Sequence, residues 1–108
     1  MATHRIHYLH KMGLDIKKSY SLKELSKISG VPEKILDEVA ERGAGAWSTN
    51  LASVRLKKDF TKNPDTSKYP RSTRLTQNEW KIARVYSFLD KGTTYKTTDS
   101  DLARKANY

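Results

Sequence analysis

The chain has 108 residues and a formal charge of +9, and its length predicts one small domain, residues 1–108. It contains no cysteine, which excludes disulfides and thiolate metal sites. Only 36% of the residues are hydrophobic and the mean hydropathy is −0.79, with no apolar run that could span a membrane and no signal-peptide-like start. The sequence therefore predicts a soluble, non-secreted protein with a thin core, and the positive charge makes nucleic acid the default partner.

A short helix is predicted in the N-terminal extension, residues 1–17, where Ile6, Leu9 and Met12 recur at helical spacing and Gly13 can end the helix. The same segment carries three regularly spaced histidines, His4, His7 and His10. A zinc site normally needs three or four converging ligands, and no acidic or thiol ligand lies nearby in the sequence. We therefore expect a solvated helix face here rather than a metal site.

A helix-turn-helix pattern follows in "SLKELSKISGVPEKILDEV". Ser21 and Glu24 form a capping box for the first helix, and Gly30 suits the left-handed turn between the helices. The inward-facing residues are Leu22, Leu25 and Ile28 in the first helix and Ile35, Leu36 and Val39 in the second. The second helix is predicted to end at Gly43, and one further helical turn in "STNLASV" completes a helix-turn-helix-like core, residues 19–56.

The stretch that follows this core differs in composition. It mixes prolines, hydroxyl side chains and bases, and residues 57–74 are predicted to form a long, irregular basic arm. A loop of this length is uncommon unless it is functional, disordered or bound to a partner. We expect this arm to become ordered when it binds.

The last part of the chain, residues 75–108, is predicted to be helical. Thr76 and Glu79 form a second capping box, and the apolar residues of "WKIARVYSFL" cover most of a helix. Trp47 and Trp80 are expected to fill the core rather than to stack on bases. Since no strand pair is apparent, the predicted fold class is mainly α, a small helical domain.

The positive charge is concentrated after the helix-turn-helix pattern. Residues 21–41 carry three bases against five acids, a charge of −2, whereas residues 42–74 carry eight bases against two acids, a charge of +6. These eight bases are the predicted nucleic-acid-binding residues: Arg42, Arg55, Lys57, Lys58, Lys62, Lys68, Arg71 and Arg74. They are interspersed with Phe60, Tyr69 and hydroxyls, a mixture that suits phosphate contacts with occasional stacking, although a solvated linker has the same composition.

The helix-turn-helix pattern itself has poor chemistry for reading DNA. Helices that enter the major groove usually present Arg, Lys, Ser, Thr, Gln or Asn at their start. Here the second helix begins with Pro32, Glu33 and Lys34, and Asp37 and Glu38 follow. Because these carboxylates would face phosphates across the groove, we expect the helix pair to act as a scaffold or to dock on protein.

No catalytic motif is present in the sequence. It contains no Ser-His-Asp set, P-loop or EF-hand loop, and its carboxylates are spread over the exteriors of predicted helices. The sequence therefore predicts a protein that is not an enzyme, needs no cofactor or metal and has no small-molecule substrate.

The segments "SLKEL", "RGAGAWSTN" and "ARVYSFLDKG" make the chain resemble a family of small basic proteins encoded by large double-stranded DNA viruses of algae and protists. The resemblance extends from about Lys18 to Leu102. It implies a viral source but no established activity. A viral source implies a place inside the host cell, in the nucleus or a cytoplasmic viral factory, or in the virion.

Two functions suit these observations. The first is a non-enzymatic, virion- or replication-associated protein that binds nucleic acid nonspecifically through its basic loop and arm. The alternative is a minor capsid or cement protein whose partners are other virion proteins, because such proteins wedge between larger subunits with extended basic arms.

Overall fold

The computed structural model describes residues 4–108 except for the side chain of Thr93, so the first three residues of the predicted N-terminal extension lie outside the described residues. The described chain is helical and contains no strand. Its elements are α1 (His4–Lys11), α2 (Leu22–Ser29), α3 (Glu33–Thr49), the 3-10 turns η1 (Leu51–Ser53) and η2 (Arg71–Thr73), α4 (Gln77–Leu89), α5 (Thr93–Lys96) and α6 (Ser100–Lys105). The prediction of a mainly α fold is confirmed.

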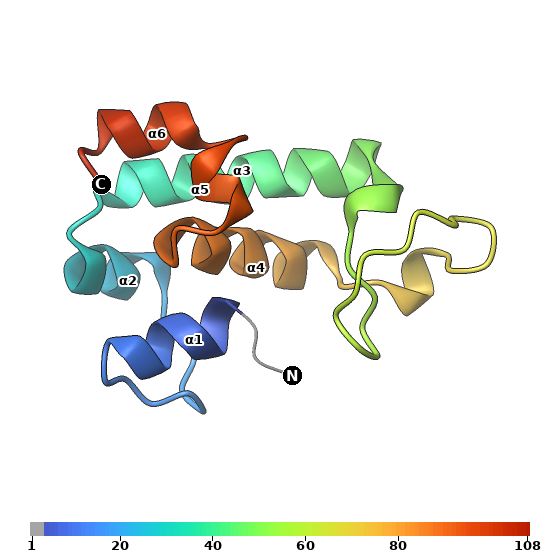
Figure 1. Ribbon diagram of the computed structural model, residues 1–108, viewed down its shortest axis with the longest axis horizontal. Helices are drawn as coiled ribbons and strands as arrows, with labels where there is room; N and C mark the ends of the chain where they lie inside the picture. Colours follow the sequence, from blue (N-terminus) through green and yellow to red (C-terminus); the bar gives the residue numbers. More distant parts are fainter. Residues whose placement is uncertain (1–3) are drawn as a thin grey trace.

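Helices α3 and α4 lie side by side in opposite directions and form the centre of the molecule (Figure 1). Helix α1 packs on α4, α2 packs on α3, and α5 and α6 follow the end of α4. We call these six helices the helical body. The connection between α3 and α4 projects from one end of the body, so the molecule measures 40 × 29 × 20 Å (Figure 1).

The predicted helix starts are present. Ser21 Oγ accepts from the backbone N–H of Glu24 at 3.2 Å, and Thr76 Oγ1 accepts from that of Glu79 at the same distance. At the other end of α2, Gly30 has φ +80°, a conformation that costs glycine little because it has no Cβ. Both capping boxes and the turn of the helix-turn-helix are therefore confirmed.

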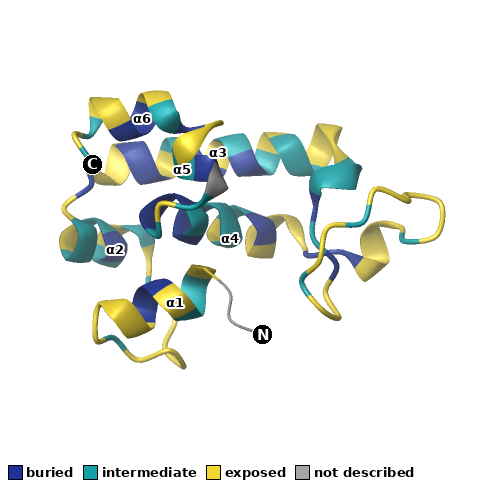
Figure 2. Ribbon diagram, in the orientation of Figure 1, coloured by how far each residue is buried: buried dark blue, intermediate teal, exposed yellow. Residues whose placement is uncertain are grey.

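Two separate groups of apolar side chains are buried. Figure 2 marks the buried parts of the ribbon in dark blue. The main core lies within the helical body and draws on α1, α2, α3, α4 and α6. The smaller cluster consists of Val54, Leu75 and Trp80, with Trp47 and Phe60 packed against it. It joins the connection between α3 and α4 to the helical body. Both tryptophans therefore pack against apolar side chains, as predicted, but in the smaller cluster and not in the main core.

The predicted end of the second helix is wrong. Helix α3 does not end at Gly43 but continues to Thr49. Gly43 is buried where α3 meets α4, and a Cβ there would lie 3.1 Å from Arg84 Cγ, so the glycine allows close helix contact rather than a helix end. The short helix predicted near the N-terminus is present as α1, in which Tyr8 and Leu9 are buried, and Met12, which follows this helix, is 41% exposed.

Candidate nucleic-acid interface

The predicted basic arm, residues 57–74, is irregular but closed on itself, and we call it the basic loop. Leu56 and Arg74 form an isolated antiparallel bridge at its neck. The backbone N–H of Lys57 donates to Thr73 O at 3.0 Å, and that of Leu75 donates to Arg55 O at 3.0 Å. The ends of the loop are therefore held together by hydrogen bonds within this chain.

Arg74 organises the interior of the basic loop. Its side chain is fully buried, and its guanidinium donates to four backbone carbonyls that belong to separate parts of the loop and its neck. These are Val54 O at 2.6 Å, Asn63 O at 2.6 Å, Tyr69 O at 2.9 Å and Asp65 O at 3.4 Å. We therefore remove Arg74 from the predicted nucleic-acid contacts, because a buried guanidinium that is bonded to carbonyls cannot reach a phosphate.

The two acids of the basic loop are engaged in local turns. Asp59 Oδ1 accepts from the hydroxyl of Thr61 at 2.7 Å, and Asp65 Oδ1 accepts from that of Ser67 at 2.7 Å. Both carboxylates also accept backbone N–H groups, and these hydrogen bonds lower the pKa of Asp59 and Asp65 below the ordinary aspartate value. Neither carboxylate forms an ion pair with a base in the described part of the chain.

Arg42 lies on the helical body and not at the basic loop. Its guanidinium binds Asp99 Oδ1 at 3.1 Å and Asp101 Oδ2 at 2.9 Å, and so joins α3 to the start of α6. Arg42 lowers the pKa of Asp101 to about 2. Because its charge is matched within the chain, Arg42 is a structural residue and drops out of the predicted interface.

Arg71 covers the end of α3. It donates to Trp47 O at 2.6 Å and to Ser48 O at 3.3 Å, and its Cζ lies 4.4 Å from the centroid of the Trp47 ring. A cation placed here satisfies carbonyls that the end of a helix leaves unpaired. Arg71 is exposed, but its two hydrogen bonds and its contact with the Trp47 ring hold it at the end of α3, so we do not count it in the interface.

Five of the eight predicted bases remain, and none forms an ion pair within residues 4–108: Arg55, Lys57, Lys58, Lys62 and Lys68. They divide into two groups. Lys58 Nζ and Lys68 Nζ lie 5.3 and 5.4 Å from the centroid of the Tyr69 ring, and Lys57 and Lys58 line a slot of about 240 Å³ beside the same ring. We call Lys57, Lys58 and Lys68 the outer lysines; all three are exposed.

Arg55 and Lys62 belong to the second group and line a different cavity. It has a volume of about 330 Å³ and lies between the neck of the basic loop, α4 and the segment that includes α5. Arg84 of α4 is its third base, and Phe60 and Trp80 supply aromatic wall. We call this cavity the polar cleft. No Asp or Glu is among its described lining residues.

Arg84 is absent from the sequence-based prediction. Its side chain is only 11% exposed and faces Asp99 Oδ2 with Nη2 at 3.6 Å. Burial raises the pKa of Asp99, which Arg84 and Arg42 offset in part. Its position in the helix is the sequence feature that could have identified Arg84 as a largely buried base. Arg84 lies four residues from the buried residues Trp80 and Phe88, in a stripe that is otherwise apolar.

The histidines of α1 do not form a solvated face throughout. His4 Nδ1 lies 2.8 Å from Asp90 Oδ2, and His7 Nδ1 lies 2.6 Å from Asp90 Oδ1, so two of the three histidines fasten α1 to the end of α4. Asp90 is remote in the sequence, which is why the spacing of the histidines gave no sign of this contact. Among residues 4–108, no group of three or more His, Asp or Glu is placed to hold a metal ion.

The acidic residues of α3 lie away from the outer lysines in the sequence and the fold. Glu33, Asp37 and Glu41 are exposed and recur every four residues, on one face of the first half of α3. The basic loop begins beyond the other end of the same helix (Figure 1). The charge separation seen in the sequence is therefore also a separation along the long axis of the molecule.

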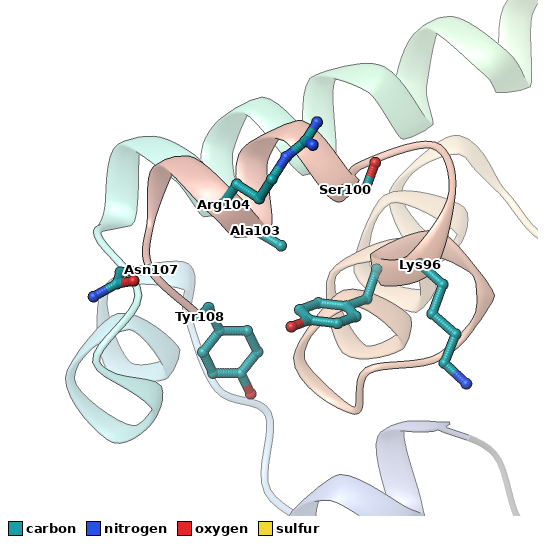
Figure 3. A pocket seen from close by; sticks show the side chains of 7 residues that line it. Lys96, Ser100, Ala103, Arg104, Asn107 and Tyr108 are labelled. Carbon is teal, nitrogen blue, oxygen red and sulfur yellow. The ribbon is translucent and has the colours of Figure 1, made fainter.

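A third cavity, of about 460 Å³, lies between α5 and α6 (Figure 3). It is lined by Lys96, Arg104 and two tyrosines, Tyr95 and Tyr108. The two rings pack on each other with centroids 5.9 Å apart, and Lys91 Nζ lies 4.9 Å from the centroid of Tyr108. Because both rings pack on Phe88 as well as on each other, they belong to the packing of the helical body, and we do not include this cavity in the interface.

Comparison of the chain with protein-family models, with curated proteins and with solved structures finds no match. Among the described residues, no helix is both long enough and apolar enough to cross a membrane. The resemblance to viral proteins stays a prediction.

Proposed function

We propose that the protein binds nucleic acid without sequence specificity through the outer lysines and Tyr69. One observation carries the proposal: on a loop that is closed by its own hydrogen bonds, two exposed lysines, Lys58 and Lys68, lie over the Tyr69 ring, and a third, Lys57, lines the slot beside that ring. Lysines bind phosphates as point charges, and a tyrosine ring among them can stack on a base of any kind. This chemistry recognises the backbone rather than the sequence of a nucleic acid.

The order of the basic loop adds to the proposal. Arg74 joins four carbonyls of the loop and its neck, so the lysines are held on a formed scaffold, and less conformational entropy is lost on binding. The exposed acids on the first half of α3 repel phosphates, which favours the approach of a polyanion at the basic loop, beyond the other end of the same helix.

The test is the affinity for duplex DNA measured over a series of salt concentrations. The triple variant Lys57→Ala, Lys58→Ala, Lys68→Ala should bind more weakly, and the slope of log affinity against log salt should become less steep by about 2 to 3, because three phosphate contacts and their released counterions are lost.

The matched control removes the same charge from the helix-turn-helix pattern. Lys23→Ala, Lys27→Ala, Lys34→Ala replaces three exposed lysines that also have no ion pair within residues 4–108. This variant should keep a slope close to that of the unchanged protein. Equal losses in the two triple variants, or a flat salt response of the unchanged protein, would contradict the proposal.

The biological setting rests on the resemblance alone. A viral source, a role in the virion or in replication, a place inside the host cell and the alternative of a minor capsid or cement protein all stay predictions. The binding proposal does not depend on any of them.

A further inference from the structure

The polar cleft is separate from the outer lysines and has chemistry of its own. Its described lining includes the bases Arg55, Lys62 and Arg84 and no carboxylate. Hydroxyl side chains, among them Ser53, Ser87 and Thr98, also line it. The hydroxyls of Ser53 and Ser87 donate to Asn50 O and Thr94 Oγ1, so the bases are the groups that give the cleft its chemistry. A cavity with several cations but no acid in its wall attracts anions.

Two buried N–H donors in the wall have no hydrogen-bond partner. They are Trp80 Nε1 and Arg84 Nε, and Trp80 as a whole is only 8% exposed. An unpaired buried donor is uncommon in a folded protein and costs about 1–3 kcal/mol. Trp47 differs in this respect, because its Nε1 donates to Leu75 O at 2.9 Å. Two residues that line the cleft thus each carry a buried, unpaired donor that an acceptor oxygen of a ligand would satisfy.

The bases of the cleft are available to different degrees. Arg84 forms an ion pair with Asp99, in which Nη2 lies 3.6 Å from Oδ2. The Arg55 side chain donates a 3.5 Å hydrogen bond to Phe60 O and its Cζ lies 6.0 Å from the centroid of the Phe60 ring, and Lys62 is exposed. Neither Arg55 nor Lys62 has a carboxylate partner within residues 4–108. Two cations are therefore left to balance a ligand with a charge near −2.

We infer that the polar cleft binds a phosphate monoester of about the size of a mononucleotide. A phosphate monoester carries a charge of about −1.5 to −2 near neutral pH and brings several strong acceptor oxygens. The volume of about 330 Å³ lies at the lower end of the range for small-molecule sites, roughly 300–1,000 Å³. Phe60 and Trp80 offer an apolar wall for the group that carries the phosphate.

The two tryptophans make a direct test possible. In ¹⁵N-labelled protein, inorganic phosphate is added at constant ionic strength while the two indole N–H signals are followed by NMR. The signal of Trp80 should move and saturate, and that of Trp47, whose N–H is already bonded, should stay nearly still. A Trp80 signal that does not move, or that moves in proportion to phosphate without saturating, overturns the inference.

Variants and probes locate the site and identify the source of the phosphate. Arg55→Gln and Lys62→Gln should each weaken phosphate binding about tenfold, whereas Lys96→Gln, an exposed lysine outside the cleft, should leave it unchanged. AMP against adenosine tests a free nucleotide, and an oligonucleotide with a 5′-phosphate against the same strand without it tests a strand end. Binding that is equal with and without the phosphate, in both pairs, would refute the inference.

This inference and the proposed nucleic-acid function fail separately. The triple variant of the outer lysines should lose affinity for duplex DNA but keep the full Trp80 response to phosphate. If that variant lost the phosphate response while retaining its fold, as judged by an unchanged Trp47 signal, the cleft would not be the phosphate site.

Discussion

The helical body and the basic loop use arginine in opposite ways. In the body, Arg42 and Arg84 both face the buried carboxylate of Asp99, so positive charge is matched by negative charge. In the loop, the side chain of Arg74 is fully buried and donates only to backbone carbonyls. It forms no ion pair with an acid within residues 4–108. The body therefore pairs Arg42 and Arg84 with a buried carboxylate, whereas the loop is held by an arginine that bonds to carbonyls, and its lysines form no ion pair within residues 4–108.

The two regions also differ in how much apolar surface supports them. The body contains the main core, which draws on five of its helices. The loop is anchored through the smaller cluster of Val54, Leu75 and Trp80, and most of its other residues are exposed (Figure 2). Because few apolar contacts hold the loop, its order depends mainly on hydrogen bonds, and it should open at a lower free energy than the body.

The largest effect is expected from Arg74→Met, which keeps a long side chain but removes every donor. Four carbonyls lose their partner, which should cost the loop about 3–5 kcal/mol of local stability while the helices persist. Hydrogen exchange at the backbone N–H groups of Lys57 and Leu75 should accelerate by about 100-fold or more. These two groups close the neck of the loop and so report its opening.

Lys68→Met is the control for this substitution because it changes an exposed residue of the same loop. It should leave exchange at the neck nearly unchanged. If Arg74→Met unfolded the body together with the loop, or left exchange at the neck unaltered, the two regions would not be stabilised in the separate ways described above.

A smaller loss of stability, in the helical body rather than in the loop, is expected from Asp99→Asn. This change leaves Arg84 buried without its counter-charge, so the free energy of unfolding should fall by about 3 kcal/mol in urea denaturation followed by circular dichroism. Hydrogen exchange at the neck of the loop should stay as slow as in the unchanged protein. Asp101→Asn is the matched control: it removes a more exposed partner of Arg42 and should cost clearly less. Equal losses would show that burial of the carboxylate is not what matters.

Much of the helical body could be predicted from the sequence because its signals are local. The capping boxes at Ser21 and Thr76 and the turn at Gly30 depend on residues within three or four positions of each other. Gly43 misled the prediction because the same residue serves at a helix end or at a close helix contact, and only the neighbouring helix decides between them. Local patterns therefore located the starts of helices better than the end of α3.

The candidate site was predictable in composition but not in role. The sequence pointed to the basic stretch, yet Arg42, Arg71 and Arg74 are each committed to contacts with distant residues, and Arg84 and Asp99 meet across different elements. A charge count treats all bases alike. Which base is buried, paired or available depends on long-range packing, and this was not visible in residue spacing.

The smallest expected effect is on the pH dependence of the basic loop. Hydrogen bonds from Thr61 and Ser67 lower the pKa of Asp59 and Asp65 in the folded chain. A carboxyl group whose pKa is lower in the folded than in the unfolded state stabilises the fold above the unfolded value, about 3.9, and this contribution is lost as the pH falls through the folded value. Acidification from about pH 5 should therefore loosen the two turns, as followed by the NMR signals of the Thr61 and Ser67 backbone N–H groups. The double variant Asp59→Asn, Asp65→Asn should remove this response, and an unchanged titration in that variant would show that the loop owes its acid sensitivity to other groups.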